Sequence, residues 1–405
     1  MPSDMPLFIK IARVTYGTLL KASRKISFKN DCGANLKQNP YLVLSNYAGK
    51  LDPVVISTVF PQHIRWSVEE SLFETKFSNK VLGDWCKAIP KHHGQNYITT
   101  LRSINNALNQ GDSVGIFPEG TRTWDGEIMP INYVSLAKMI RMFKVPVLFV
   151  HLEGAFAQDP RWADKRRHGP IVVNIKYKID PLEFSKMDIP TLAALVKKYL
   201  FFSNDQWKET VDYKYTSHKR AEGLQQFLYM CPRCKAVDSL RTEGNRVVCK
   251  KCNTNTVLND KDNLTSIDVP FTKLSQWHKW QAKNIGKVKQ FPEERGVLLK
   301  KGDANNTGDL EELSTNFTIQ LKDDALHLKH NKETIDLPLE KISSFVLTTK
   351  QTMNLFCGQD LYRIRLLPKA NLLKYQEYYQ AYKVRTKTQS AQTATKTVRP
   401  NIGKT

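Results

Sequence analysis

Apolar runs and helical periodicities alternate through the first half of the chain. Residues 41–45 (YLVLS), 113–117 (SVGIF) and 147–151 (VLFVH) are short, nearly continuous apolar runs, which predict buried strands. Residues 98–109 instead carry apolar side chains at helical spacing. Strands that alternate with helices are typical of an α/β domain, in which loops at the strand ends bind ligands. We therefore expect one such domain over residues 26–215.

The pattern changes to short strands in the last third of the chain. Runs such as ALHLKH and LYRIRLL, separated by Asn, Asp and Gly, predict β-strands, and ANLLKYQEYYQAYK predicts one closing helix. Strands followed by one terminal helix resemble a pleckstrin-homology-like domain, which we place at residues 295–384. The resemblance implies either contact with lipid head groups or docking of a protein. From Lys383 onward the chain has six cationic side chains and no acid, so residues 385–405 are expected to form a basic disordered tail.

The first 25 residues predict an amphipathic helix at a membrane interface. On a helical wheel, residues 5–25 separate into an apolar face and a basic face, which Leu7 and Val14 interrupt. The basic face holds Lys10, Arg13, Lys21, Arg24 and Lys25. Such a helix can lie in the headgroup layer, where its cations meet anionic lipid. A helix packed on the domain core would show a similar pattern, and both interpretations stay open.

Composition adds a strong charge bias to this picture. The chain has 405 residues, enough for two or three folded units, and a formal net charge of +22. A charge of this size points to an anionic partner, either nucleic acid or an anionic membrane surface. The sequence has no apolar run long enough to span a bilayer and no signal peptide with a cleavage site. We therefore expect a cytoplasmic protein that binds peripherally to the inner face of a membrane.

Four of the seven cysteines form two closely spaced pairs. Cys231 and Cys234 are followed, after an interval of fourteen residues, by Cys249 and Cys252. Four thiolates on two such knuckles give the closed tetrahedral shell of a structural Zn²⁺ site. We therefore predict a zinc ribbon at residues 226–258, with two disulfides or a redox pair as the alternatives. Ribbons often bind nucleic acid, so the ribbon and the net charge together suggest a nucleic-acid-binding protein as one interpretation of the chain.

The central apolar run ends in a loop whose residues suit an anionic ligand. Pro118 and Gly120 break the strand and leave Glu119, Thr121 and Arg122 at its mouth. Arg122 offers a planar fork of donors that matches phosphate, and a neighbouring glycine lets the backbone approach a ligand closely. The loop is therefore a candidate site for an anionic head group.

This loop, FPEGTR, resembles a motif of the glycerolipid acyltransferase family. Upstream, residues 46–53 (NYAGKLDP) match the family's N-H-x-x-x-x-D-P block except at Tyr47, which stands where the family has its catalytic histidine. Downstream, Val145 and Pro146 begin an apolar strand similar to the family's last block. The resemblance covers roughly residues 1–215 and implies a mixed sheet flanked by helices.

The middle block of the family is altered in this chain. Residues 86–93 (CKAIPKHH) fall where the family has a phosphate-binding arginine, but this segment contains no arginine. Lys91, His92 and His93 are the candidate substitutes. The resemblance therefore implies a phosphate site formed by Lys91, Thr121 and Arg122.

The resemblance also implies a reaction. In this family the histidine deprotonates an acceptor hydroxyl, which attacks an acyl thioester carried by coenzyme A or acyl carrier protein, and the aspartate orients the histidine. Here Tyr47 and Asp52 would occupy the catalytic positions, and Glu119 with Gly120 would shape the acyl-transfer site. A phenol titrates near pH ~10, against ~6.5 for imidazole. Loss of a general base typically costs about 10² to 10⁴ in rate, so Tyr47 should impair the reaction.

Three functions are consistent with these features. The first is a 1-acylglycerol-3-phosphate acyltransferase-like enzyme at a membrane surface, acting on a lysophospholipid or glycerol phosphate, with Tyr47 either a natural variation or an introduced change. The second is a non-catalytic lipid-binding protein of the same fold. The third, a nucleic-acid-binding protein, is the least favoured because the motifs point to lipid substrates.

Overall fold

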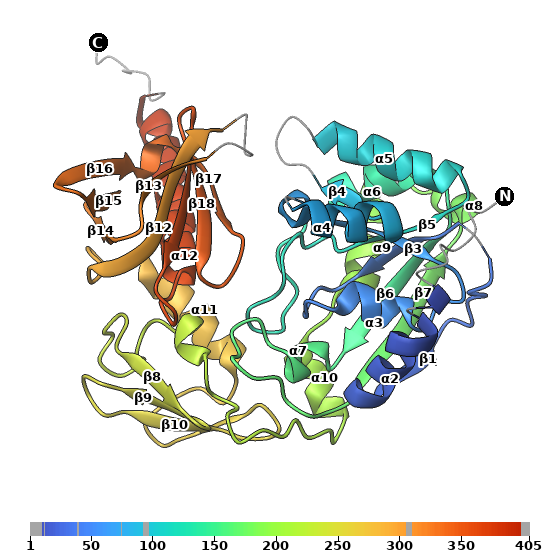
Figure 1. The fold of residues 1–405 in the computed structure, drawn as a ribbon, viewed down its shortest axis with the longest axis horizontal. Helices are drawn as coiled ribbons and strands as arrows, with labels where there is room; N and C mark the ends of the chain where they lie inside the picture. The colour runs from blue at the N-terminus through green and yellow to red at the C-terminus, as the bar shows by residue number, and fades with distance from the viewer. Residues whose placement is uncertain are drawn as a thin grey trace, which may run out of the picture. The chain divides into compact units, whose positions relative to one another are not determined.

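The computed structural model describes residues 10–397 except 12, 39, 74, 92–96 and 305–309. Its contacts divide the chain into two compact units (Figure 1). The first unit comprises Met1–Arg161, Lys165–Ser217 and Asp260–Asp262, and the second comprises Trp162–Asp164, His218–Asn259 and Asn263–Thr405.

The first unit is built on a seven-stranded sheet in the order β1-β7-β6-β2-β5-β3-β4. The strands are β1 (Ile26–Asn30), β2 (Leu42–Ser45), β3 (Ile64–Glu69), β4 (Ile89–Lys91), β5 (Ser113–Ile116), β6 (Val147–Glu153) and β7 (Ile171–Ile179). Neighbouring strands run parallel except β6 and β7, which are antiparallel. The sheet is therefore mixed, which confirms the predicted fold class for this part of the chain.

Helices cover both faces of this sheet. They are α2 (Thr18–Arg24), α3 (Asp52–Ser57), α4 (Lys76–Asn79), α5 (Tyr97–Asn109), α6 (Tyr133–Phe143), α7 (Ala155–Gln158), α8 (Pro181–Phe184), α9 (Ile189–Leu200) and α10 (Asn204–Thr210). On the central strand β2, Leu42 and Leu44 belong to the core that includes α5, α6 and α9. Val43 points the other way, into the core that includes α2 and α3. A strand buried on both faces needs apolar side chains at every position, which explains the continuous run in the sequence.

The predicted N-terminal helix is only partly described, because residues 1–9 and 12 lie outside the described residues. The described part is a π-helical turn, η1 (Arg13–Gly17), followed by α2. Leu20 is buried, whereas Ile11, Val14 and Leu19 are 56, 74 and 65% exposed. The segment therefore packs on the core through Leu20 and leaves other apolar side chains in solvent. Within the described ranges, every helix is too short or too polar to cross a membrane.

The second unit begins with the cysteine-containing sheet. Its strands are β8 (Leu240–Glu243), β9 (Arg246–Cys249), β10 (Asn255–Leu258) and β11 (Leu264–Thr265), in the order β11-β10-β9-β8. Neighbouring strands are antiparallel. The first cysteine pair precedes β8, and the second spans the turn between β9 and β10, so the fold brings both pairs to the same end of this small sheet.

The rest of the second unit is an eight-stranded antiparallel sheet and two helices, α11 (Leu274–Ile285) and α12 (Leu373–Thr397). The sheet order is β16-β15-β14-β12-β19-β18-β17, and β13 pairs with β12. The strands are β12 (Glu294–Asp303), β13 (Glu311–Ser314), β14 (Phe317–Lys322), β15 (Ala325–His330), β16 (Glu333–Pro338), β17 (Ile342–Leu347), β18 (Thr352–Cys357) and β19 (Asp360–Leu366). The sequence predicted this succession of short strands and one closing helix.

The closing helix is longer than expected. We expected a disordered tail from residue 385, but α12 continues to Thr397. No glycine or proline, the two strongest helix breakers, occurs between residues 385 and 397. The absence of a breaker lets the helix continue past the part that packs on the sheet. Residues 398–405 lie outside the described residues.

A buried lysine joins the cysteine-containing sheet to the larger sheet. Lys374 on α12 is fully buried and pairs with Asp238, which precedes β8, and with Glu294 Oε2 of β12 at 2.5 Å. A buried ammonium group is costly unless it is paired, so these contacts favour one joint arrangement. The sequence suggested separate domains at residues 226–258 and 295–384, whereas both lie in one compact unit.

Candidate active site

The loop after β2 is held at both ends by side-chain hydrogen bonds. Asn46 exchanges two hydrogen bonds with the backbone of Leu152 on β6, at 2.8 and 3.3 Å. Asp52, at the start of α3, accepts the backbone N–H groups of Ala48 and Gly49 on Oδ2, at 2.7 and 2.8 Å. Burial raises the pKa of Asp52 to about 7, although these two donors oppose the rise. Asp52 therefore shapes the loop that presents residue 47.

Tyr47 lies at one end of a stack of three aromatic rings. Its ring lies 4.3 Å from that of Phe117, which in turn lies 4.8 Å from that of Trp66. Burial, and secondly the charge of Asp52, raise the pKa of Tyr47 to about 12. Among the described residues its hydroxyl has no hydrogen-bond partner. Because the phenol stays protonated near neutral pH, Tyr47 cannot take a proton from an acceptor hydroxyl.

Glu119 connects the two sequence motifs. Its Oε1 accepts the N–H of Tyr47 at 2.7 Å, and its Oε2 accepts the N–H of Met129 at 2.8 Å. Burial raises the pKa of Glu119 to about 8, against the effect of both donors. With both oxygens engaged by backbone, Glu119 fixes the shape of the site and has no oxygen free of these contacts. The loop is also tied by the N–H of Thr123, which donates to the carbonyl of Tyr47 at 2.9 Å.

Gly120 and Lys91, for which the sequence analysis predicted different roles, lie close together. Gly120 has a φ of 71°, in the left-handed region that favours glycine. A Cβ atom at this position would lie 2.8 Å from Lys91 Nζ. Lys91 ends β4, the strand next to β3 at the edge of the sheet. The absence of a side chain at residue 120 thus lets the ammonium group approach the FPEGTR loop.

A cavity of about 430 Å³ opens beside these residues. Tyr47, Lys91 and Gly120 line it, together with Ile116, Phe117 and Pro118 at the end of β5. Most of its remaining lining comes from α5 and α6. These residues are Tyr97, Thr100, Leu101 and Ile104 on α5, and Ser135, Leu136, Lys138, Met139 and Met142 on α6. A volume of this size is ordinary for a ligand site, and the lining combines many apolar side chains with Lys91 and Lys138. Asp52, Glu119, Thr121 and Arg122 are not among the lining residues.

One site residue was missed by the sequence analysis. Arg161 is buried, and its guanidinium donates to Thr121 Oγ1 and to the carbonyl oxygen of Arg122. It follows α7 and belongs to none of the motifs in the sequence. Nothing in the local sequence pattern identifies Arg161, because its role depends on contacts with Thr121 and Arg122, which lie 40 and 39 positions earlier in the chain.

His151 does not line the cavity, so it is not placed to act as a base there. His151 on β6 is buried, and its Nε2 lies 2.9 Å from the carbonyl oxygen of Tyr199 on α9. Burial lowers the pKa of His151 to about 4. His92 and His93 lie outside the described residues. Within the described part of the chain, no histidine lines the cavity.

Residues 28–152 match the family model Acyltransferase. A probable 1-acyl-sn-glycerol-3-phosphate acyltransferase from Mycoplasma genitalium is 22% identical over 205 residues, which cover 48% of this chain and 75% of that protein. Residues 28–152 of the first unit are therefore an acyltransferase-family domain. It is similar to 1-acylglycerol-3-phosphate acyltransferases, and residues Tyr47, Asp52 and 117–122 all lie inside the matched range.

Two solved structures are also similar to parts of the chain. The 1-acyl-sn-glycerophosphate acyltransferase from Thermotoga maritima shares 19% identity with a TM-score of 0.38, covering 50% of this chain and 82% of that one. The N-terminal PH domain of the human ARAP2 protein shares 11% identity with a TM-score of 0.17, covering 28% of this chain and 90% of that one. Both scores are low, so the family assignment of the acyltransferase domain rests on the sequence comparisons.

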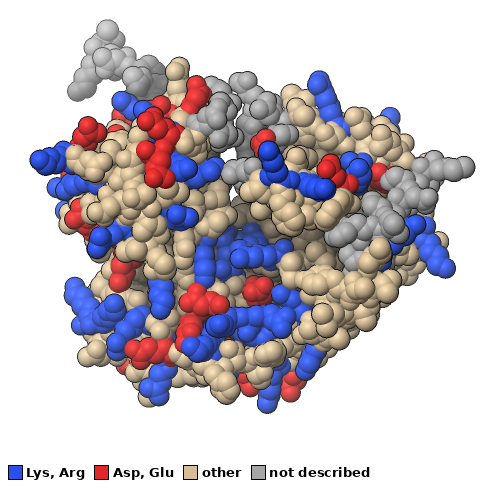
Figure 2. All heavy atoms as spheres, viewed as in Figure 1, with Lys and Arg blue, Asp and Glu red and all other residues tan. Residues whose placement is uncertain are grey.

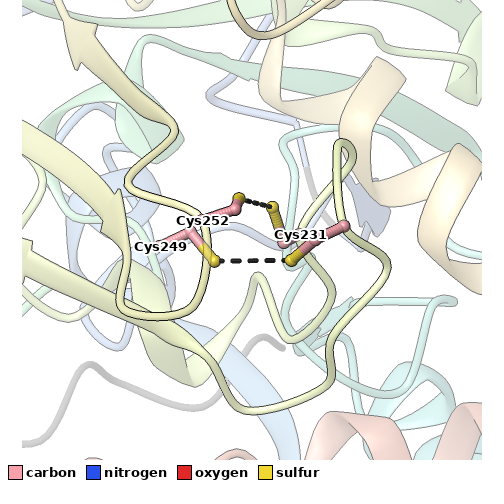
Figure 3. Close-up of side chains that lie close together, drawn as sticks. Cys231, Cys249 and Cys252 are labelled. Carbon is pink, nitrogen blue, oxygen red and sulfur yellow. Dashed lines mark hydrogen bonds between the residues drawn. The ribbon is translucent and has the colours of Figure 1, made fainter.

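The four cysteines outside the acyltransferase domain form a compact cluster (Figure 3). All four Sγ atoms lie within 4.8 Å of one another, and the pairs Cys231–Cys252 and Cys234–Cys249 are each 3.7 Å apart. A disulfide needs about 2.05 Å, so the described thiols are not paired in that way. Four sulfurs about 2.3 Å from a tetrahedral Zn²⁺ lie about 3.8 Å from each other. The arrangement is therefore compatible with zinc.

Proposed function

We propose that the acyltransferase domain moves an acyl group from a coenzyme A or acyl-carrier-protein thioester to the hydroxyl of a lysophospholipid or glycerol phosphate. The observation that carries this proposal is the cavity, which combines apolar side chains of α5 and α6 with Lys91 and with Gly120 of the FPEGTR loop. An acyl chain suits the apolar part, and the phosphate of the acceptor suits the cationic part. The cavity thus suits both an acyl chain and the phosphate of an acceptor.

In this reaction the acceptor hydroxyl attacks the thioester carbonyl carbon, a C–O bond forms and the C–S bond breaks. The hydroxyl proton ends on the departing thiol. We assign Lys91, Thr121 and Arg122 to the acceptor phosphate, and we assign Asp52, Glu119 and Gly120 to the shape of the acyl-transfer site. Tyr47 occupies the position of the base but stays protonated, since its pKa is about 12. We therefore propose that the reaction is slow with tyrosine at this position.

A second candidate function is lipid binding without catalysis. It is favoured by the Tyr47–Phe117 stack, which places a neutral ring at the wall of the cavity where the family has its base. The two candidates are separated by incubating the purified protein with acyl-CoA and lysophosphatidic acid and following free thiol. Slow thiol release above the rate without protein supports the enzyme. Saturable lysophosphatidic acid binding with no thiol release supports the lipid-binding protein.

Arg122→Lys is expected to weaken the use of phosphate-bearing acceptors by about 10 to 100-fold, because a hydrogen bond to a charged group is worth roughly 1.5–3 kcal/mol and lysine loses the bidentate geometry. The expected change is in the concentration dependence for lysophosphatidic acid, measured by thiol release or by equilibrium binding. Arg102→Lys, at an exposed position of α5, is the matched control. Unchanged dependence on acceptor concentration in Arg122→Lys would remove Arg122 from the site.

Membrane association is expected to be peripheral and assisted by charge. The exposed apolar side chains Ile11, Val14 and Leu19 adjoin several basic residues in the first 25 positions. Lys and Arg also cover more of the face seen in Figure 2 than Asp and Glu do. We propose that this N-terminal segment contacts an anionic surface at the cytoplasmic face of a membrane.

Deletion of residues 1–25 is expected to reduce cosedimentation with anionic liposomes, because it removes apolar and basic side chains together. High salt or alkaline carbonate should release part of the full-length protein from the same vesicles. Neutral liposomes serve as the control for the charge contribution. If the truncated and full-length chains sediment equally well with anionic liposomes, this segment is not the membrane contact.

For the second unit, we propose one structural Zn²⁺ held by Cys231, Cys234, Cys249 and Cys252. Two knuckle turns support this assignment, since the N–H of Lys235 donates to the carbonyl of Cys231 and that of Asn253 to Cys249, at 3.0 and 2.9 Å. The antiparallel sheet with its closing helix supports a pleckstrin-homology-like domain at residues 295–384, for lipid contact or protein docking. The family assignment leaves nucleic-acid binding as the least favoured function.

A further inference from the structure

Arg161 lies outside the range matched by the family model, yet it contacts the loop at the centre of the site. Its side chain is 6% exposed. Its Nη1 donates to Thr121 Oγ1 at 2.8 Å and to the carbonyl oxygen of Arg122 at 3.2 Å. Its guanidinium carbon lies 4.3 Å from the ring centroid of Trp124, which is itself 2% exposed. The guanidinium is thus held between a ring and two groups of the loop.

These contacts constrain the two residues assigned to phosphate. A threonine hydroxyl has one donor hydrogen and two acceptor lone pairs, and a guanidinium can only donate. Because Arg161 occupies an acceptor position of Thr121 Oγ1, the hydroxyl hydrogen of Thr121 points elsewhere and can be donated to a ligand. The second hydrogen bond fixes the peptide from which the Arg122 side chain extends. Arg161 therefore limits the freedom of two donors at once.

The positive charge of Arg161 also favours the binding of an anion at this loop. Burial, and secondly the neighbouring charge of Arg122, lower the pKa of Arg161 to about 9, so it remains mainly cationic at neutral pH. Two guanidinium groups that repel each other are stabilised when an anion binds between or beside them. The fold thus maintains positive charge at the loop before any substrate arrives.

We propose that Arg161 is a positioning residue of the acceptor site, which holds Thr121 and Arg122 ready for a phosphate monoester and thereby sets the preference for phosphate-bearing over phosphate-free acceptors. This inference rests on the proposed function and names a determinant of its acceptor specificity. It assigns the role to a side chain that reaches the motif from residues beyond β6 and α7.

The test measures equilibrium binding of lysophosphatidic acid and of the monoacylglycerol with the same acyl chain, both below their micellar concentrations, to the full chain. Arg161→Lys is expected to weaken lysophosphatidic acid binding by roughly 10 to 100-fold, the usual effect of losing hydrogen bonds to a charged group. Monoacylglycerol binding should change less than about twofold, because this lipid has no phosphate for Thr121 and Arg122 to bind. Arg65→Lys is the matched control, since Arg65 donates to Asp112 and to the carbonyl of Lys87 away from the loop.

A second pair of variants keeps the proposal testable even if Arg161→Lys does not fold. Thr121→Ser retains the hydroxyl and should keep the preference for lysophosphatidic acid over monoacylglycerol. Thr121→Val removes the hydroxyl and should reduce this preference. Combining Thr121→Val with Arg161→Lys should cost less than the sum of the two single changes, because Arg161 acts partly through Thr121.

Three results would overturn the proposal. The first is an unchanged preference for lysophosphatidic acid in folded Arg161→Lys or in Thr121→Val. The second is an equal loss of affinity for both lipids, which indicates a merely structural role. The third is an unaltered chain that itself shows no preference for the phosphate-bearing lipid, which rejects the phosphate site as a whole. In contrast, a clear preference without any thiol release rejects acyl transfer and leaves the role of Arg161 supported.

Discussion

Acyl transfer from acyl-CoA to lysophosphatidic acid is expected to rise by about 10² to 10⁴ when Tyr47 is replaced by histidine, the usual contribution of a positioned general base. Tyr47 stays protonated because burial and Asp52 raise its pKa to about 12. The loop that carries it is held by Asn46, Asp52 and Glu119 through backbone hydrogen bonds that do not involve its ring. A smaller imidazole should therefore enter the site without moving the loop.

The pH dependence provides an independent readout of this prediction. In Tyr47→His the rate should rise with pH as the imidazole loses its proton, and the unaltered chain should lack this titration. Tyr47→Phe keeps the stack on Phe117 and should bring no gain. Thiol release measured over a range of pH tests all three chains.

The aspartate partner should matter only once a histidine is present. Asp52→Asn on the Tyr47→His background keeps an acceptor for Ala48 and Gly49 but removes the charge, so it should reverse much of the gain. A folded Tyr47→His protein without acyl transfer to any lysophospholipid or glycerol phosphate, with either thioester donor, would count against the enzyme. It would then favour the lipid-binding function.

The second large effect is expected on removal of zinc. Structural zinc sites in small peptides have apparent binding energies of about 10 to 16 kcal/mol at neutral pH, which is at least as large as the stability of many domains, about 5 to 15 kcal/mol. Chelation, or Cys249→Ser, should therefore unfold the cysteine-containing sheet. The loss of stability should extend to the larger sheet. Unfolding of the cysteine-containing sheet would move Asp238 away and leave the buried Lys374 with Glu294 as its remaining acidic partner of the two.

Metal analysis and thermal unfolding with and without chelator measure this effect, and one zinc per chain is expected. Cys357→Ser alters a half-buried cysteine outside the cluster and serves as the control. Much less than one zinc per chain, with all four cysteines intact and reduced, would contradict the assignment. Unfolding of the cysteine-containing sheet with no change in the larger sheet would contradict the coupling through Lys374.

The sequence by itself determined the elements and the motifs. The apolar run at residues 41–45 predicted β2, because a strand buried on both faces has no polar position. The regular spacing of Cys231, Cys234, Cys249 and Cys252 predicted a cluster, since each pair is brought together by its own local turn. Burial patterns and short turns each depend on a few neighbouring residues, so they can be predicted directly from the sequence.

Only the tertiary structure decided which distant side chains meet. Gly120 lies against Lys91 because β3 pairs with both β4 and β5. Two other contacts likewise depend on how whole elements pack. Arg161 donates to Thr121, and Lys374 pairs with two acidic side chains. A buried guanidinium or ammonium group is tolerated only where the fold provides acceptors for it. The free energy that selects these partners belongs to the packed structure, and no local stretch of sequence contains it.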